Sequence, residues 1–247
     1  MKKLLIFGGT TEGRELAEWC AANSISADVS VTTDYGARLL GNDKLINTFT
    51  GKLDSREMET LIRAGKYTAV TDATHPYAAE ATRNIRAACD AVGARYYRLL
   101  REQSELSGTV VRSINEAVEL LNRSDKVILS TLGSKELPEL AGIKHCKQRV
   151  WVRVLPADGI EEYCVSFGFE RSHIITGTGP FSAEENVRHI KQCGAELLLT
   201  KESGKTGGYP EKIAAAKECN IETITIARPP ESGYSFEQLT KIIGELI

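Results

Sequence analysis

Five short segments of the chain combine glycine with hydroxyl, basic or imidazole side chains, a mixture that suits the binding of an anionic ligand. Each of them directly follows a stretch that predicts a β-strand. The five segments are residues 8–14, 72–77, 131–135, 176–182 and 200–208. In parallel α/β sheets, ligands bind where strands end and loops lead into helices. We therefore expect the five segments to converge on one ligand-binding cleft.

The first segment resembles a nucleotide-binding turn. A strand-like run, residues 4–7, is followed by Gly8, Gly9 and Gly13 and then by an amphipathic helix pattern. Backbone N–H groups and the positive end of the helix would point at one place, which suits a phosphate. The glycine spacing differs from the G-x-G-x-x-G fingerprint, and a turn that only packs helix against strand explains Gly8 and Gly9 almost as well. Both interpretations stay open. The candidate cofactor-binding residues of this segment are Gly8, Gly9, Thr10, Thr11, Gly13 and Arg14.

The end of the second predicted strand bears on the choice of nucleotide. The dinucleotide fingerprint expects an acidic residue there, which hydrogen-bonds a ribose 2′-hydroxyl. This sequence has Thr32 and Thr33 first and Asp34 after them. The two hydroxyls, with Arg38 one turn further on, would accept a 2′-phosphate, whereas Asp34 would oppose it. The residues leave NADPH and NADH both open.

The segment after the strand at 68–71 also has two interpretations. It contains Asp72, Thr74 and His75 directly before Pro76. These side chains are candidates for a binding site. In the simpler alternative, Asp72 and Thr74 cap a helix that begins at Pro76, and His75 is a surface residue.

The three segments of the second half differ in how specific they are. Gly133-Ser134-Lys135 resembles the end of a phosphate loop, but the upstream glycine is missing, which disfavours NTP hydrolysis. Residues 177–180 are explained equally by a rigid turn, because Pro180 suits the first position of a helix. Residues 200–208 place two lysines and three glycines beside hydroxyl groups at the end of a buried strand. That composition favours a role in holding an anion.

Strand-like and helix-like segments alternate along the whole chain. The predicted strands are 4–7, 28–31, 45–49, 68–71, 95–99, 109–111, 127–131, 150–155, 173–176, 196–200 and 222–226. Helices are predicted after most of them, one from Pro76 to a C-cap at Gly93, and others begin with capping pairs. These pairs are Asp54 with Glu57, Ser113 with Glu116, Ser182 with Glu185 and Ser235 with Gln238.

This alternation is typical of parallel sheets with helices on both faces. The number of strands exceeds that of an eight-unit barrel, and 247 residues are comfortable for two domains. We predict an α/β protein with two Rossmann-like domains, residues 1–124 and 125–247, and a ligand cleft between them. The boundary is placed near Asn122 to Lys126.

Charge and hydropathy exclude several classes of function. The net charge is −2, and no run of Lys and Arg is long enough to follow a nucleic-acid backbone. The apolar runs have the length of strands, so no membrane span is expected. The first strand begins within three residues of Met1, which leaves no room for a signal peptide. We expect a cytoplasmic protein.

The cysteines indicate free thiols. Six of them lie far apart without C-x-x-C spacing: Cys20, Cys89, Cys146, Cys164, Cys193 and Cys219. Free buried thiols are favoured over disulfides or metal ligands. The pair His145-Cys146 has no second ligand pair nearby, and no metal site is predicted.

Taken in order, the motifs show a specific resemblance over essentially the whole chain. The motifs are GGTTEGRELA (8–17), DATHPYA (72–78), Tyr97-Arg98-Leu99-x-Arg101, TLGSKEL (131–137), WVRVLP (151–156), TGTGPFSAEEN (176–186), LLTKESGKTGG (198–208), EKIAAAKE (211–218) and Ala227-Arg228-Pro229. The chain resembles the precorrin-6A reductase family, which acts in the corrin ring pathway to vitamin B12. Tyr77 is a mild departure from the family pattern.

The resemblance implies two Rossmann-like halves with a nicotinamide cofactor and a tetrapyrrole held between them. It also implies NAD(P)H-dependent reduction of a ring double bond of precorrin-6A, or of its cobalt complex, to the dihydro form. A hydride moves to an electrophilic ring carbon, and a proton is added at the neighbouring carbon. The cofactor supplies the hydride chemistry, and the protein supplies positioning and electrostatics. Because the substrate carries many carboxylates, basic residues near the loop ends are expected to bind it.

The resemblance also suggests roles for individual residues. His75 and Tyr77 would orient the macrocycle or relay a proton, and Lys201 is a third catalytic candidate. The candidates for substrate binding are Arg98, Lys135, Gly179, Pro180, Phe181, Ser203, Gly204 and Lys205. Asp72, Ala73 and Thr74 join the candidates for cofactor binding, together with Thr32 and Thr33.

Two other functions remain in competition. One is a different enzyme of the same pathway, for example a methyltransferase, whose glycine motifs serve a sulfonium cofactor. The other is a non-catalytic nucleotide sensor, which needs one nucleotide site and none of the segments between residues 176 and 208.

Overall fold

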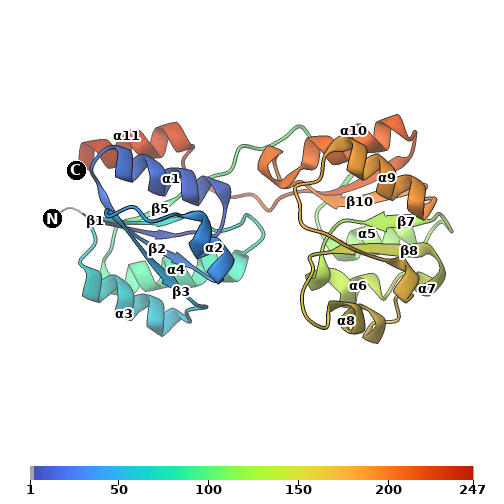
Figure 1. Cartoon of the computed structure of the whole chain (residues 1–247), viewed down its shortest axis with the longest axis horizontal. Coiled ribbons are helices and arrows are strands. Elements are labelled where there is room, and N and C mark those ends of the chain that lie inside the picture. The colour runs from blue at the N-terminus through green and yellow to red at the C-terminus, as the bar shows by residue number, and fades with distance from the viewer. Residues whose placement is uncertain (1–2, 247) are drawn as a thin grey trace. The chain divides into compact units, whose positions relative to one another are not determined.

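The computed structural model describes residues 3–246 and divides them into two compact units. The first unit comprises the residues up to Arg101 and those from Pro230 onward, and the second comprises Glu102–Pro229. The chain therefore leaves the first unit once and returns to it for its last segment, which ends in a helix (Figure 1).

The first unit contains one parallel sheet and five helices among its described residues. Its strands are β1 (Lys3–Phe7), β2 (Ser26–Val31), β3 (Ile46–Thr50), β4 (Ala69–Asp72) and β5 (Tyr96–Arg98). Its helices are α1 (Thr11–Ala22), α2 (Asp34–Leu39), α3 (Ser55–Gly65), α4 (Ala79–Val92) and α11 (Phe236–Leu246). The strand order is β3-β2-β1-β4-β5, which matches the first five strands of the doubly wound Rossmann order 3-2-1-4-5-6.

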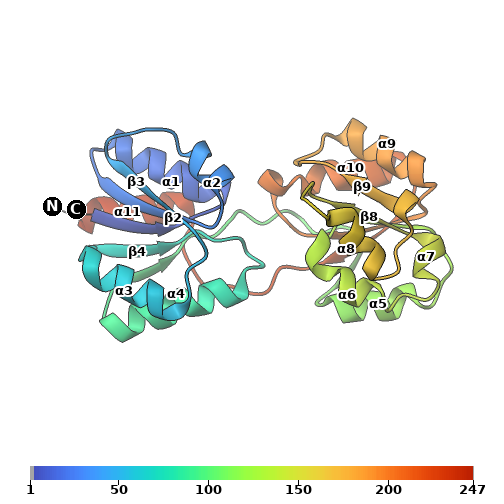
Figure 2. The ribbon, with the colours of Figure 1, turned by 60° about the horizontal axis from the view of Figure 1, so that its bottom comes forward.

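Helices cover both faces of this sheet, as Figure 2 shows. One face packs Leu4 and Ile6 of β1 against α1 and α11, and the other packs Leu5 and Phe7 against α3 and α4. All four of these side chains are at most 4% exposed, which explains why β1 is an uninterrupted apolar run. The alternation of side chains along β1 thus fixes both layers of the unit.

The second unit repeats the same architecture with a larger sheet. Its strands are β6 (Thr109–Val111), β7 (Ile128–Ser130), β8 (Val150–Val154), β9 (Ile174–Thr176), β10 (Leu197–Lys201) and β11 (Glu222–Ile226). Its helices are α5 (Ile114–Leu121), α6 (Leu137–Leu140), α7 (Cys146–Arg149), α8 (Ile160–Ser166), α9 (Ala183–Cys193) and α10 (Tyr209–Glu218), with the 3₁₀ helices η1 (Ser134–Glu136), η2 (Arg171–His173) and η3 (Lys205–Gly207). The order β6-β11-β10-β7-β8-β9 is parallel throughout.

The predicted fold class is confirmed, and every predicted strand is present with ends shifted by at most two residues. The capping boxes of Asp54 with Glu57 and of Ser182 with Glu185 are both formed. One helix start was predicted wrongly. Pro76 lies in a turn closed by a hydrogen bond from the N–H of Ala78 to the carbonyl of His75, and α4 begins at Ala79 without a side-chain cap, because its N-cap residue is Ala78.

The division into units differs from the boundary predicted near residues 122–126. Val111 of β6 pairs with Ile226 of β11, which places the segment from Glu102 in the second sheet. The chain end returns to the first unit because Leu239 and Ile243 of α11 are fully buried in its core. A single domain boundary predicted from the order of elements along the chain cannot show that the last helix belongs to the first unit.

Three further observations concern the described residues 3–246. All six cysteines are free. No helix within this range is long and apolar enough to cross a membrane. No group of three or more His, Cys, Asp or Glu side chains in the same range is arranged to hold a metal ion.

The role of α11 in the first unit can be tested by truncating its buried side chain. Leu239→Ala is expected to lower the free energy of unfolding by about 2–5 kcal/mol, because it leaves a cavity under a fully buried leucine. Hydrogen exchange should accelerate in residues 3–101 and remain unchanged in residues 102–229. Lys241→Ala, at an exposed position of the same helix, is the control. Faster exchange confined to residues 102–229 would contradict the assignment of α11.

Candidate active site

The first candidate site lies at the carboxyl ends of β1 and β4, which are neighbours in the sheet of the first unit. From β1 the chain continues into α1 on one face, and from β4 it continues into α4 on the other. Such a reversal is the topological switch point at which α/β sheets bind nucleotides. The predicted segments 8–14 and 72–77 meet there, since the N–H of Ala73 bonds the carbonyl of Phe7 at 2.9 Å.

The three glycines of the first turn serve different purposes. A Cβ on Gly13 would lie 3.1 Å from the Cβ of Ala73 and 3.2 Å from the Cα of Gly8, so α1 packs closely on the strand ends. A Cβ on Gly8 would meet a methyl group of Val29 at 3.2 Å. Gly9 has a φ of +104° and nothing within 4 Å of an added Cβ. Packing therefore explains Gly8 and Gly13, whereas Gly9 leaves the backbone open to a ligand.

Thr10 joins the helix to the neighbouring loop. It is the N-cap of α1, and its Oγ1 accepts a hydrogen bond from the N–H of Gly13 at 3.2 Å. The same hydroxyl donates to the carbonyl of Ala73 at 2.8 Å. The positive end of α1, at which Thr11 is the first residue, is thereby fixed at the switch point.

The charged residues around this helix start are paired. Arg14 forms an exposed ion pair with Glu18 at 2.7 Å. Glu12, in the first turn of α1, binds the guanidinium of Arg101 at 2.7 Å. Arg101 thus neutralises the one acidic side chain of that first turn, which would otherwise repel an anion at the helix end.

Asp72 is the centre of a buried network. Its Oδ1 accepts from the N–H and hydroxyl of Thr74, at 3.0 and 2.6 Å, and from Nη1 of Arg98 at 2.9 Å. Its Oδ2 accepts from the hydroxyl of Tyr96 at 3.0 Å. Burial and the Asp72 charge raise the pKa of Tyr96, which keeps that hydroxyl a donor. The network orients the loop after β4.

Arg98 belongs to the same network. It is 3% exposed, and its Nη2 donates to both carboxylate oxygens of Glu231, at 3.0 and 3.2 Å. Its Nη1 also donates to the carbonyl of Thr74 at 2.9 Å. A guanidinium that is buried and bound to two carboxylates of its own chain is suited to hold the loop in place. This arrangement favours a positioning role for Arg98 over the direct substrate contact expected from the sequence.

His75 and Tyr77 follow on the outer side of this loop. His75 is exposed, and its Nδ1 accepts from the N–H of Tyr77 at 3.3 Å. Since Nδ1 is the acceptor, the neutral imidazole carries its proton on Nε2. The two rings lie 5.7 Å apart. The structure thus places an imidazole ring and a phenol ring near each other in the loop after β4.

The residues after β2 lie at the next strand end of the same sheet. Thr33 caps α2 by accepting from the N–H of Gly36 at 3.2 Å, and Thr32 is exposed. Arg38 is exposed in the last turn of α2. Asp34 lies in the first turn of the same helix.

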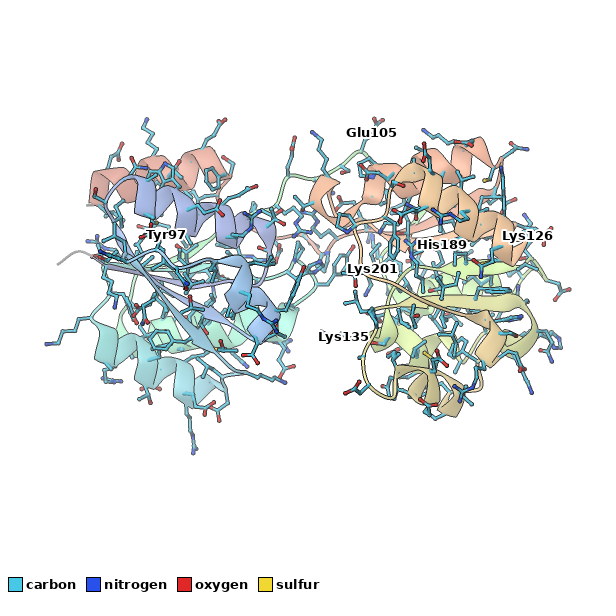
Figure 3. All side chains as sticks on the ribbon, in the orientation of Figure 1. Tyr97, Glu105, Lys126, Lys135, His189 and Lys201 are labelled. Carbon is cyan, nitrogen blue, oxygen red and sulfur yellow. The ribbon has the colours of Figure 1, made fainter. Side chains whose placement is uncertain are left out.

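The sequence candidates of the second unit lie mostly at the carboxyl ends of β7 and β10, which are also neighbours at a reversal of strand order. Lys201 forms an ion pair with Glu136, and Lys135 is exposed (Figure 3). Ser203 donates to the carbonyl of Gly207 at 3.0 Å. Lys205 lies across from Glu102 at 3.6 Å, and both side chains are largely exposed.

A buried acid shapes the loop after β10. Glu202 is fully buried and accepts from the N–H groups of Ser104 and Gly204, at 3.0 and 2.9 Å, and from Nε of Arg228 at 2.6 Å. Gly204 has a φ of +70° and a ψ of 179°, a conformation restricted to glycine. Gly204 is therefore required by the backbone of this loop.

A pocket of about 180 Å³ opens beside these loops, and the sequence analysis missed two of its residues. Its wall includes Gly179, Pro180 and Phe181, which were predicted to bind substrate, and also Arg153 and Lys212. Both cations are more than nine-tenths buried. Their signal was present in the sequence as a basic residue inside the apolar strand 150–154 and a lysine on the buried face of α10.

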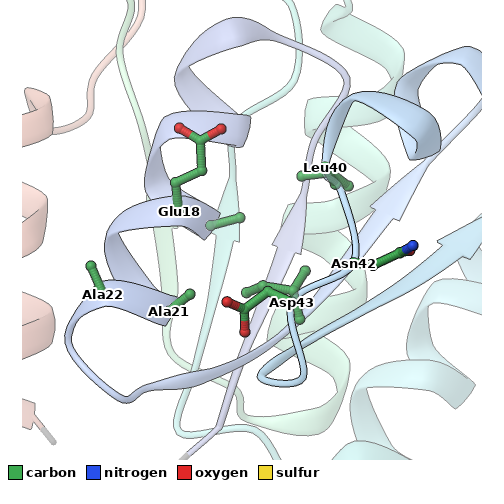
Figure 4. A pocket seen from close by; sticks show the side chains of 8 residues that line it. Glu18, Ala21, Ala22, Leu40, Asn42 and Asp43 are labelled. Atoms are coloured by element: carbon green, nitrogen blue, oxygen red, sulfur yellow. The ribbon is translucent and has the colours of Figure 1, made fainter.

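A larger hollow of about 460 Å³ lies between α1 and the segment that leads into β3 (Figure 4). Glu18 and Asp43 supply its charged side chains, and no basic residue lines it. Because that segment precedes β3, the hollow is at the amino ends of the strands. Neither its charge nor its position suits a pyrophosphate.

The structural role of Asp72 can be tested by an isosteric change. Asp72→Asn is expected to lower the free energy of unfolding by about 3–5 kcal/mol, because it removes a carboxylate from a buried arginine. Urea unfolding measures the change, with exposed Asp90→Asn as the control. A variant of unchanged stability that loses only its affinity for NADPH would show instead that Asp72 contacts the cofactor.

Comparisons with known proteins agree on one family. The family model described as precorrin-6x reductase CbiJ/CobK matches residues 3–246. The cobalt-precorrin-6A reductases of Methanothermobacter thermautotrophicus and Salmonella typhimurium are each 34% identical to this chain over 92% of its length, and the matches span 76% and 87% of those proteins. A solved structure of CobK precorrin-6A reductase has the same fold, with a TM-score of 0.79 and 21% identity over 100% of this chain and 97% of that one. The chain belongs to the precorrin-6x reductase family.

Proposed function

We propose that this chain transfers a hydride from NADPH to a ring double bond of precorrin-6A or of its cobalt complex during cobalamin biosynthesis. The observation that carries the proposal is the match to the reductase family over residues 3–246. The Rossmann strand order of the first unit, with an open glycine turn at its switch point, supports it.

The first unit fits a nicotinamide dinucleotide. Gly9 combines a positive φ with free space, so the backbone there can approach a pyrophosphate closely. The fixed end of α1 would stabilise the negative charge, with Thr10, Thr11 and Gly13 holding the turn in shape. When bound, the nicotinamide supplies the hydride.

The preference for NADPH rests on the end of β2. The first two residues after that strand are Thr32 and Thr33, where an NADH enzyme has an acid that binds the ribose 2′-hydroxyl. Arg38 forms no ion pair with any residue of the described range 3–246, so its guanidinium is available for a 2′-phosphate. Asp34 opposes this arrangement, and the balance between the two side chains sets the ratio of affinities.

His75 is the best candidate for the group that delivers the proton. It is exposed beside the switch point, and its imidazolium form would give up a proton and return to the neutral imidazole. Tyr77 lies next to it and would orient the ring or assist the transfer. Lys201 is paired with Glu136, which makes it better suited to bind a carboxylate of the substrate than to donate a proton.

The exposed polar groups of the second unit supply charge and hydrogen bonds for the rim of the macrocycle. Lys135 and Lys205 are both exposed at strand ends. Ser203 and Gly204 shape the loop that leads from the end of β10 to Lys205. We assign these residues to binding of the substrate carboxylates, without a part in the hydride step.

The reaction is tested by anaerobic incubation with metal-free and with cobalt-loaded substrate, each with NADPH and NADH. Oxidation of the nucleotide, together with an absorption shift from the loss of conjugation, is the expected result, and NADPH should be preferred. Arg38→Gln should raise the KM for NADPH about tenfold and leave the KM for NADH unchanged. Without nucleotide oxidation on either substrate, the reductase proposal fails, and a methyltransferase would give that result.

The role of His75 has its own test. His75→Ala should lower kcat by about 10²- to 10⁴-fold, the usual contribution of a general acid, and leave the Kd of NADPH unchanged. Tyr77→Phe should have a smaller effect in the same direction. His145→Asn, at an exposed position of the second unit, is the control. Wild-type turnover of His75→Ala at saturating substrate would remove His75 from the mechanism.

A further inference from the structure

Two buried cations line the pocket beside α10 in the second unit. Arg153 projects from β8 and Lys212 from the first turns of α10, and they are 7% and 8% exposed. Neither forms an ion pair with any residue of the part of the chain that the structure describes, 3–246. Burying a charged group without a counter-charge is costly, so this arrangement requires an explanation.

The hydrogen bonds of the two cations leave several N–H groups for a ligand. Arg153 donates from Nη1 to Oδ1 of Asn186 at 2.8 Å and to Nδ1 of His189 at 3.1 Å. Its Nε and Nη2 form no hydrogen bond with any residue between positions 3 and 246, the range that the structure describes. Lys212 has one long hydrogen bond, 3.4 Å, to the hydroxyl of Ser203. Both side chains line the pocket, where their remaining donors can meet an anion.

The surroundings keep this charge positive and oriented. The guanidinium of Arg153 stacks on the ring of Phe181 at 4.1 Å, which holds it in place. His189 has a pKa below its ordinary value, because of its burial and the neighbouring Arg153, so it stays neutral and can accept from Nη1. Three acids act on these cations: Glu185 raises the pKa of Arg153, and Glu211 and Glu202 raise the pKa of Lys212. Glu202 is already ion-paired with Arg228.

Burial lowers the pKa values of both cations. Burial, together with the charge of Arg153, lowers the pKa of Lys212 to about 8. Burial also lowers the pKa of Arg153, to about 10. An anion placed between them would reverse both effects.

The size of the pocket limits the ligand. A volume of about 180 Å³ is below the roughly 300–1,000 Å³ typical of pockets that enclose a whole cofactor. It is large enough for one acidic side arm. The lining includes Gly133, Gly177 and Gly179, which contribute no side chains to the cavity.

We propose that Arg153 and Lys212 form a binding site for one carboxylate arm of the tetrapyrrole substrate. The inference rests on the proposed function, which identifies the substrate as a ring with carboxylates on its rim. A phosphate group of the nucleotide has similar chemistry, but the nucleotide fits the first unit, where the glycine turn lies. The site fixes one edge of the macrocycle through two charge-assisted contacts and thereby selects which ring is presented for reduction.

The proposal is tested with Arg153→Gln and Lys212→Gln in the full chain. Equilibrium titration with the tetrapyrrole, anaerobically and without NADPH, should show a Kd raised about 10- to 100-fold in each variant. The Kd for NADPH should be unchanged. Arg153→Lys retains the charge and should lose less affinity than Arg153→Gln. Lys217→Gln, at an exposed position of the same helix, is the matched control.

Melting temperature separates binding from a structural role. Because both cations are buried and neither is in an ion pair within residues 3–246, both variants should melt at or above the wild-type temperature in the absence of ligand. A clear fall in melting temperature, an unchanged Kd for the tetrapyrrole, or a raised Kd for NADPH alone would each overturn the proposal. A wild-type enzyme that binds the tetrapyrrole without reducing it would defeat the proposed reaction only.

Discussion

The close approach of Gly13 to Ala73 is the constraint on which the first unit depends. A side chain at residue 13 would lie 3.1 Å from the Cβ of Ala73, so only glycine lets α1 descend onto the ends of β1 and β4. Thr10 then fastens the helix start by capping it and by binding the carbonyl of Ala73. From this contact follow the position of the positive helix end, the open backbone at Gly9 and the place of His75. The nucleotide and proton roles proposed above depend on that geometry.

The buried arginines of the chain show how unusual the pocket of the second unit is. Arg98 is bound to Asp72 and Glu231, and Arg228 is bound to Glu202. Arg149 donates to three backbone carbonyls, which satisfy its guanidinium without a carboxylate. Arg153, together with Lys212, is left with donors facing a cavity. Arginines bound to carboxylates or to several backbone carbonyls hold loops in place, whereas Arg153 and Lys212, which form no ion pair within residues 3–246, mark a place for a ligand.

The sequence predicted the architecture well because its signals are local. Strands such as β1 and β10 are apolar runs of strand length, and capping boxes such as Ser182 with Glu185 mark helix starts directly. The return of α11 to the first unit was not predictable in this way, since it depends on contacts between residues more than 200 positions apart, such as Leu16 and Leu239.

The site was predicted less completely. The strand ends were predicted correctly. The sequence does not show, however, whether an arginine in a motif contacts a ligand or a carboxylate of its own chain. Arg98 was therefore expected to bind substrate and lies buried against Asp72 and Glu231. Arg153 was not among the candidates because they were sought at strand ends, and it lies inside the strand, where a buried charged residue is itself a signal.

The central claim is that the cofactor binds at the switch point of the first unit, and hydrogen exchange with and without NADPH tests it most directly. The account predicts slower exchange on NADPH binding at residues 8–14 and 72–75, where the N–H groups after β1 and β4 lie, with residues 131–135 and 203–212 unaffected. Protection confined to residues 131–135 and 203–212 would contradict it.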